Sequence, residues 1–145
     1  MKFYTKDNYD PTTSVGFALS KARNVILAEM DLVMKDLDIS GQQMGIILSM
    51  ARNVASTPFE LSKLLEIDTG LMTRMLDKLE QQDILARTRS VEDRRMVNLQ
   101  LTEKGRHIAT EIPKRAPEVL NKRLENFSNE EFLEFRRLLT KFLRA

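Results

Sequence analysis

The chain has 145 residues, of which 30% are charged and 42% hydrophobic, and its formal net charge is +2. This composition is typical of one folded domain, and we find neither an apolar run long enough to span a membrane nor the apolar core of a signal peptide. We therefore expect a cytoplasmic protein. The absence of cysteine excludes thiol chemistry, and one histidine and five dispersed glycines argue against metal sites, catalytic triads and phosphate-binding loops. We expect no metal, no cofactor and no enzymatic activity.

Two longer helices are predicted near the N-terminus. Apolar residues in steps of three and four predict a first helix over residues 15–37, with Ser14 as its N-cap. Ser40 and Gln43 form a capping-box pattern at the start of a second helix. This second helix is apolar on nearly all sides, so we expect it to be buried between other elements.

Two shorter helices follow. Thr57 caps the first of them, and Pro58 suits its first turn because proline lacks the N–H group that would go unpaired there. Asp68 or Thr69 caps the next helix, which continues to about Gln82.

The sequence period then changes from helical to extended. Apolar and polar residues alternate over residues 97–101, which predicts a half-buried strand, and residues 85–89 are extended enough to pair with it. Because the polar and charged segment 90–94 joins the two, we expect a two-stranded hairpin with a basic tip.

The C-terminal part of the chain is again helical. Thr102 begins a long helix that contains Pro113 and Pro117. Each proline removes one backbone N–H donor, so we expect a kink or a break near residues 112–117. Ser128 begins a last helix with a pronounced apolar stripe.

Two short helices joined by a tight turn and followed by a hairpin predict a winged helix-turn-helix, a mainly α fold with a small β-hairpin wing. The fourth helix is the candidate reader of a DNA major groove, because its outer face carries short or hydrogen-bonding residues: Thr69, Gly70, Thr73, Arg74 and Lys78. Arg74 can form two hydrogen bonds to guanine. Asp77 on the same face would repel phosphate unless it is paired, for instance with Arg74 or Lys78. Considered alone, this face fits a merely solvated amphipathic helix equally well.

The hairpin favours the DNA-binding interpretation. It carries four arginines against two acidic residues, and the arginines are Arg87, Arg89, Arg94 and Arg95. An arginine at a protruding tip suits the narrow minor groove, where the negative potential is enhanced. Asp93 is close enough in sequence to form a salt bridge with one of the two adjacent arginines. A loop that serves only solubility is the alternative.

The hairpin also matches a known pattern. The pattern D-x-R-x-x-x-L-x-L-T-x-x-G is fulfilled at every fixed position, by Asp93, Arg95, Leu99, Leu101, Thr102 and Gly105. This part of the sequence resembles the wing of MarR-family transcriptional regulators, and residues 73–80 resemble the recognition helix of that family. The order of helices agrees with the family over essentially the whole chain. Two features depart from it: Asp83 stands where many members have glycine, and the two prolines of the long helix are not part of the pattern.

The resemblance implies a homodimer held together by the N- and C-terminal helices. Here these regions would be residues 1–37 and 105–145, around a winged helix-turn-helix of residues 38–104. The implied interface contains apolar residues of the terminal helices: Val15, Phe132, Phe135, Leu139 and Phe142. Packing of the same stripe on the first helix of its own protomer is the alternative. The resemblance also implies that Arg94 enters the minor groove and that Asp93 holds Arg95.

Members of the family often lose DNA affinity when a small aromatic or phenolic ligand binds between the dimer and DNA-binding regions. Candidate pocket residues here are Arg23, Met50 and His107, although methionines also fill cores and the other two also suit a surface position. We therefore predict a dimeric, sequence-specific DNA-binding transcriptional regulator, a ligand-released repressor that binds a pseudo-palindromic operator. The alternative is a winged-helix module that binds another protein instead of DNA.

Overall fold

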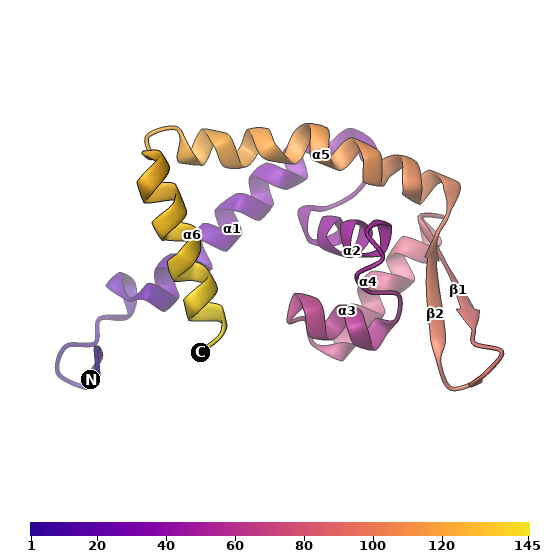
Figure 1. The fold of residues 1–145 in the computed structure, drawn as a ribbon, viewed down its shortest axis with the longest axis horizontal. Helices are drawn as coiled ribbons and strands as arrows, with labels where there is room; N and C mark the ends of the chain where they lie inside the picture. The colour runs from indigo at the N-terminus through magenta and orange to yellow at the C-terminus, as the bar shows by residue number, and fades with distance from the viewer.

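The computed structural model describes residues 1–145 as six α-helices and a two-stranded antiparallel sheet (Figure 1). The elements in chain order are α1 (Val15–Val33), α2 (Gly41–Ala51), α3 (Pro58–Leu65), α4 (Thr69–Gln81), β1 (Leu85–Arg89), β2 (Val97–Leu101), α5 (Glu103–Leu124) and α6 (Asn129–Leu143). Two 3-10 helices, η1 (Pro11–Thr13) and η2 (Lys35–Leu37), lie on either side of α1. The expected winged helix-turn-helix between terminal helices is confirmed, and no helix has both the length and the apolar character needed to cross a membrane.

Side-chain caps begin the helices where the sequence predicts them. Ser14 and Thr57 accept hydrogen bonds from backbone N–H groups of α1 and α3, and Ser40 and Gln43 form the complete capping box of α2. Of the two candidates before α4, Asp68 is the cap, since its Oδ1 accepts a hydrogen bond from the N–H of Leu71 at 3.0 Å. These caps satisfy backbone donors that have no partner within the helix.

The first helix ends earlier than expected, and the long C-terminal helix has no break at its prolines. The first helix stops at Val33 rather than residue 37, because the chain tightens into η2 and then turns at Asp38, which has a left-handed φ of 55°. The long helix α5 runs without a break through Pro113 and Pro117. Both prolines are exposed, while Ile112 and Val119 are buried, so the packing of α5 on the core outweighs the two backbone hydrogen bonds that the prolines remove.

The hydrophobic core is formed jointly by α1, α2, α4, α5 and the base of the hairpin, with α1 and α2 packed directly on α5. The largest fully buried side chains include Met34, Ile46, Leu76, Leu79 and Ile112. The strands pair from Leu85 opposite Leu101 to Arg89 opposite Val97, so the hairpin extends away from this core.

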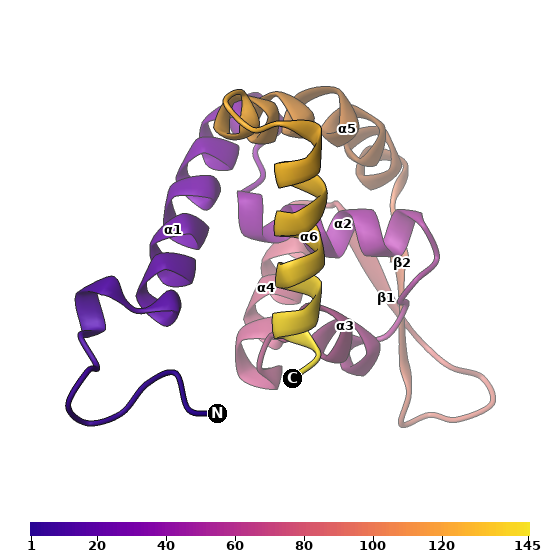
Figure 2. The same cartoon turned by 60° about the vertical axis from the view of Figure 1, so that its left-hand side comes forward.

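The helix α6 stands apart from the rest of the protomer. It is separate from α4 in Figure 1 and from α1 in Figure 2, and none of its residues is buried. A strongly amphipathic helix with no buried residue leaves its apolar side uncovered within one protomer.

Candidate nucleic-acid interface

The outer face of α4 carries the five residues predicted to read DNA. All of them, Thr69, Gly70, Thr73, Arg74 and Lys78, are exposed, while the opposite face of the helix is buried in the core. The hydroxyl of Thr73 donates to the carbonyl of Thr69 at 2.8 Å. A Cβ added to Gly70 would lie 3.7 Å from NH1 of Arg74, so the guanidinium lies back along the helix toward its N-terminal end. That end is the part of a recognition helix that enters the major groove.

Asp77 is paired, but not with the partner expected from the sequence. Its Oδ1 lies 2.7 Å from NH2 of Arg87 on β1, and neither Arg74 nor Lys78 forms an ion pair. The expected partner on the same helix is wrong. Spacing along the sequence predicts which side chains are neighbours on one helix, but it does not predict contacts between different elements. The pair neutralises Asp77 on the outer face of α4 and fixes the helix to the hairpin.

Arg87 consequently plays a different part from the other wing arginines. Its side chain is 29% exposed, it points to α4, and its buried Nε has no hydrogen-bond partner. Arg89, Arg94 and Arg95 are exposed and form no ion pair, so their charges are available to a polyanion. The predicted basic wing thus contains a structural arginine at its base and three free ones toward its tip.

The turn at the wing tip is organised by side chains that bind the backbone. Oδ1 of Asp93 accepts a hydrogen bond from the N–H of Arg95 at 3.0 Å, and Oγ of Ser90 accepts from the N–H groups of Glu92 and Asp93. Asp93 forms no ion pair, so the expected salt bridge to Arg94 or Arg95 is absent. Aspartate in a turn binds N–H groups one or two residues onward, and here that contact leaves both guanidinium groups free.

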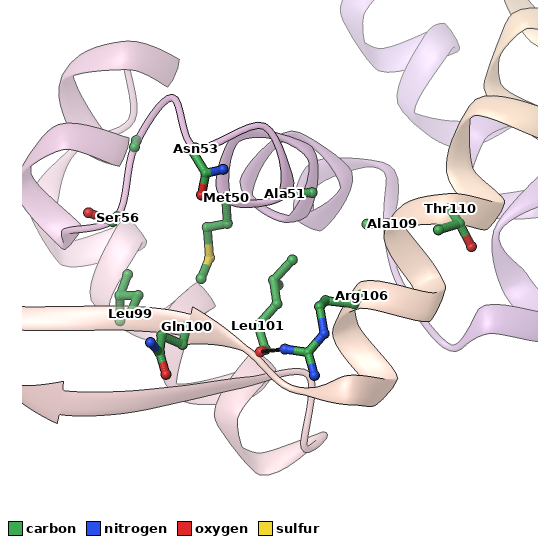
Figure 3. Close-up of a pocket in the computed structure, with 11 residues that line it drawn as sticks. Met50, Ala51, Asn53, Ser56, Leu99, Gln100, Leu101, Arg106, Ala109 and Thr110 are labelled. Carbon is green, nitrogen blue, oxygen red and sulfur yellow. Dashed lines mark hydrogen bonds between the residues drawn. The ribbon is translucent and has the colours of Figure 1, made fainter.

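A cavity of about 550 Å³ lies between the end of α2, the strand β2 and the start of α5 (Figure 3). Six of its eleven lining residues are hydrophobic, and the full set is Met50, Ala51, Asn53, Ala55, Ser56, Leu99, Gln100, Leu101, Arg106, Ala109 and Thr110. NH1 of Arg106 donates to the carbonyl of Leu101 at 2.8 Å, the contact drawn in Figure 3. The cavity thus joins the wing to the first turns of α5.

Only one of the three candidate pocket residues lies at this cavity. Met50 lines it, whereas Arg23 and His107 are exposed elsewhere. The cation at the cavity is Arg106, the immediate neighbour of His107. Neighbouring side chains on a helix point about 100° apart, so Arg106 lines the cavity while His107 does not.

The apolar residues predicted at a dimer interface lie open in the protomer. Val15, Phe135 and Phe142 are exposed, while Phe132 and Leu139 are half-buried. Since α6 has no buried residue, its stripe is not covered by the protomer's own first helix.

Ion pairs fix α1 and the following η2 against α5. Arg123 binds both carboxylate oxygens of Glu29, and Arg115 binds the carboxylate of Asp36 and the carbonyl of Val33. Hydrogen bonds from these guanidinium groups hold the pKa values of Glu29 and Asp36 below their ordinary range.

Comparison with known proteins gives consistent similarities. The family model for the MarR family matches residues 41–97. The multiple antibiotic resistance protein MarR of Salmonella typhimurium is 33% identical over 108 residues, which cover 74% of this chain and 75% of that protein. These similarities are to transcriptional regulators, and they do not favour a module that binds only other proteins.

Two solved structures share the fold. A mutant MarR from Escherichia coli in complex with operator DNA is 26% identical with a TM-score of 0.81, covering 93% of this chain and 99% of that one. BpsR of Bordetella bronchiseptica, whose DNA binding is regulated by 6-hydroxynicotinic acid, is 22% identical with a TM-score of 0.82. That alignment covers 94% of this chain and 98% of BpsR.

Proposed function

Because the chain belongs to the MarR family of transcriptional regulators, we propose that its homodimer binds a pseudo-palindromic DNA operator through α4 and the hairpin of each protomer. The family is one of regulators rather than enzymes. The observation that carries the proposal is the arrangement of unpaired, exposed basic side chains: Arg74 and Lys78 on α4, and Arg89, Arg94 and Arg95 on the wing. We further propose that the protein acts in the cytoplasm.

The roles of these residues follow from their positions. The two copies of α4 enter successive major grooves, about 10 base pairs apart, where Arg74 binds guanine and Thr73 presents its methyl group to thymine. Thr69 and Gly70 lie at the N-terminal end of α4, which favours a phosphate, and Lys78 binds the backbone. Arg94 enters the minor groove with Arg95 beside it. Arg87 supports the wing from its base through Asp77 instead of touching DNA.

The chain divides into a DNA-binding region and a dimerisation region. Residues 38–104 form the DNA-binding region, and residues 1–37 and 105–145 form the dimerisation region. The open apolar stripe of α6 supports this division, because an exposed stripe of this kind marks a protein interface.

The cavity between β2 and α5 supports a ligand-released repressor. Its apolar lining and the guanidinium of Arg106 suit a small aromatic or phenolic ligand. A ligand there would contact both the strand β2 of the wing and the first turns of the dimerisation helix α5. It would therefore favour one position of the wing relative to α5.

Base recognition by Arg74 provides the test. The affinities of wild type and Arg74→Ala are measured for DNA from beside the gene and for a scrambled duplex. The variant is expected to lose discrimination worth about 1–3 kcal/mol. The control is Arg52→Ala, since Arg52 is exposed at the end of α2 and forms no ion pair. Unchanged discrimination in Arg74→Ala would remove this residue from base reading, and no binding to any DNA would support the protein-binding alternative.

A further inference from the structure

The C-terminal end of α4 is bound by polar contacts to three other parts of the protomer. Gln82 is the C-cap of α4, and its Oε1 accepts a hydrogen bond from Nε2 of Gln43 at 2.9 Å. Its Nε2 donates to the carbonyl of Asp38 at 2.5 Å. Its backbone carbonyl accepts from Nζ of Lys104 at 2.8 Å. One residue therefore connects the recognition helix to α2, to the turn after α1 and to α5.

Gln43 is held in a single orientation on its own side of this contact. It is only 3% exposed, and its Oε1 accepts a hydrogen bond from the N–H of Ser40 at 2.9 Å. Because the amide oxygen is used at Ser40, the amide nitrogen is directed to Gln82. A buried amide with both ends bonded cannot rotate without leaving a polar atom unpaired.

The contact continues from α2 to α1. Oδ1 of Asp31 accepts a hydrogen bond from the N–H of Gly41 at 2.6 Å. A Cβ on Gly41 would lie 2.8 Å from Cβ of Met30, so the start of α2 lies directly against α1. A movement of α1 is therefore passed to the start of α2 and from there to the end of α4.

The rest of α4 is attached differently. Its buried face packs through apolar side chains such as Met72 and Leu76, whose contacts have little directional preference. Asp77 fixes the helix to the hairpin. Hydrogen bonds are directional, so the bonds of Gln82 constrain the angle of α4 against α1 and α2. They act together with Thr102, the N-cap of α5, whose hydroxyl donates to the carbonyl groups of Asp83 and Ile84 just after α4.

We propose that the Gln43–Gln82 pair is a positioning contact that sets the separation of the two recognition helices in the dimer, an inference that rests on the proposed function. The helix has 13 residues and is about 20 Å long at 1.5 Å per residue. A tilt of about 10° at its C-terminal end moves its N-terminal end by about 3 Å, roughly the rise of one base pair. A small change at Gln82 therefore shifts the preferred half-site spacing.

Gln82→Met separates this role from helix capping. The variant keeps the length of the side chain and leaves the capping box of Gln43 and Ser40 intact, but it removes both side-chain hydrogen bonds of Gln82. The matched control is Gln81→Met, because the adjacent Gln81 is exposed and its side chain forms no hydrogen bond in the structure.

The first experiment measures the distance between the recognition helices without DNA. Since the chain has no cysteine, Thr69→Cys gives one labelling site per protomer at the N-terminal end of α4. Electron–electron resonance between two spin labels is expected to give a narrow distance distribution, which Gln82→Met broadens or shifts and Gln81→Met leaves unchanged. An unchanged distance distribution in Gln82→Met overturns the proposal. A wild type that gives no measurable distance between labels on two protomers overturns it as well.

The second experiment measures affinity for operators whose half-site spacing is native, one base pair longer or one base pair shorter. Gln82→Met is expected to lose about tenfold affinity at the native spacing and to discriminate less between the three, as expected when one or two hydrogen bonds are removed. A general loss of stability would lower all three affinities equally, and an unchanged spacing preference would contradict the proposal. A wild type that binds none of the DNAs while the distance experiment succeeds would refute the proposed function and leave the positioning contact supported.

Discussion

Asp77 of α4 and Arg87 of β1 form an ion pair with 2.7 Å between Oδ1 and NH2, and this pair fixes the recognition helix to the wing. The two residues come from different elements, and each would be unfavourable without the other. An unpaired Asp77 would repel DNA phosphate, and an unpaired Arg87 would leave a half-buried cation without a counter-charge. The pair joins the helix and the hairpin into one unit, which carries the proposed DNA-binding surface.

A double-mutant cycle tests this pair. Asp77→Ala, Arg87→Met and the double variant are unfolded with urea, and we expect a coupling energy of about 1 kcal/mol, as for a charged hydrogen bond that is partly exposed. Additive effects would show that the two side chains do not interact in solution.

The tip of the wing should determine salt dependence. Arg94→Ala and Arg95→Ala should each reduce the slope of log affinity against log salt by about one unit for each phosphate that the variant side chain no longer neutralises. Arg52→Ala serves again as the control. The variant with the larger effect identifies the arginine that enters the minor groove, and unchanged slopes in both would remove the tip from the interface.

The apolar side of α6 should hold the dimer together. Phe135 and Phe142 are exposed in the protomer, so Phe135→Asp and Phe142→Asp place a charge where the partner covers them. Sedimentation should show dissociation of these variants at concentrations where wild type is dimeric. Phe59→Asp is the control, because Phe59 is 66% exposed on α3, outside the proposed interface. A stable dimer of the α6 variants would contradict this assignment.

The ion pairs between α1 and α5 make a pH-dependent contribution to stability. The pKa values of Glu29 and Asp36 are lowered in the folded chain by hydrogen bonds from Arg123 and Arg115. Lowered carboxyl pKa values stabilise the fold above the pKa of the unfolded chain, and this stabilisation is lost as pH falls through the folded values.

Thermal melts from neutral to acidic pH check this dependence. Glu29→Gln with Asp36→Asn should lower the melting temperature at neutral pH and flatten its fall toward acid. Glu118→Gln should change neither, because Glu118 is exposed and forms no ion pair. A double variant with the same pH profile as wild type would show that other groups dominate.

Gly105 should tolerate no side chain. A Cβ at this position would lie 2.1 Å from the carbonyl oxygen of Ile84, where the first turn of α5 crosses the start of the hairpin. Gly105→Ala is therefore expected to cost about 3 kcal/mol or more in unfolding free energy. Gly16→Ala, whose added Cβ meets only Oγ of Ser14 at 3.9 Å, should fold normally. Equal melting temperatures would contradict the close approach.

Much of the fold could be predicted because local chemistry specifies it. Caps such as Ser14 and Thr57 satisfy backbone donors one turn away, and alternation over residues 97–101 is visible along the chain. The uninterrupted α5 was not predictable in this way. Whether Pro113 breaks a helix depends on which side faces solvent, and that is set by packing against other elements.

The same distinction applies to the candidate site. The exposed face of α4 follows from helical periodicity, so Arg74 and Lys78 were found from the sequence. The partners of Asp77 and Gln82 lie on other elements, and no periodicity brings them together. The cavity is likewise formed by α2, β2 and α5 jointly, which is why Arg106 was missed.

The most direct test of the central claim is the fluorescence anisotropy of labelled DNA from beside the gene, titrated with wild type and Arg94→Ala at low and moderate salt. We predict nanomolar binding by wild type that weakens steeply with salt, and much weaker binding by the variant. Absence of binding by wild type at low salt, to specific and random DNA alike, would contradict the claim.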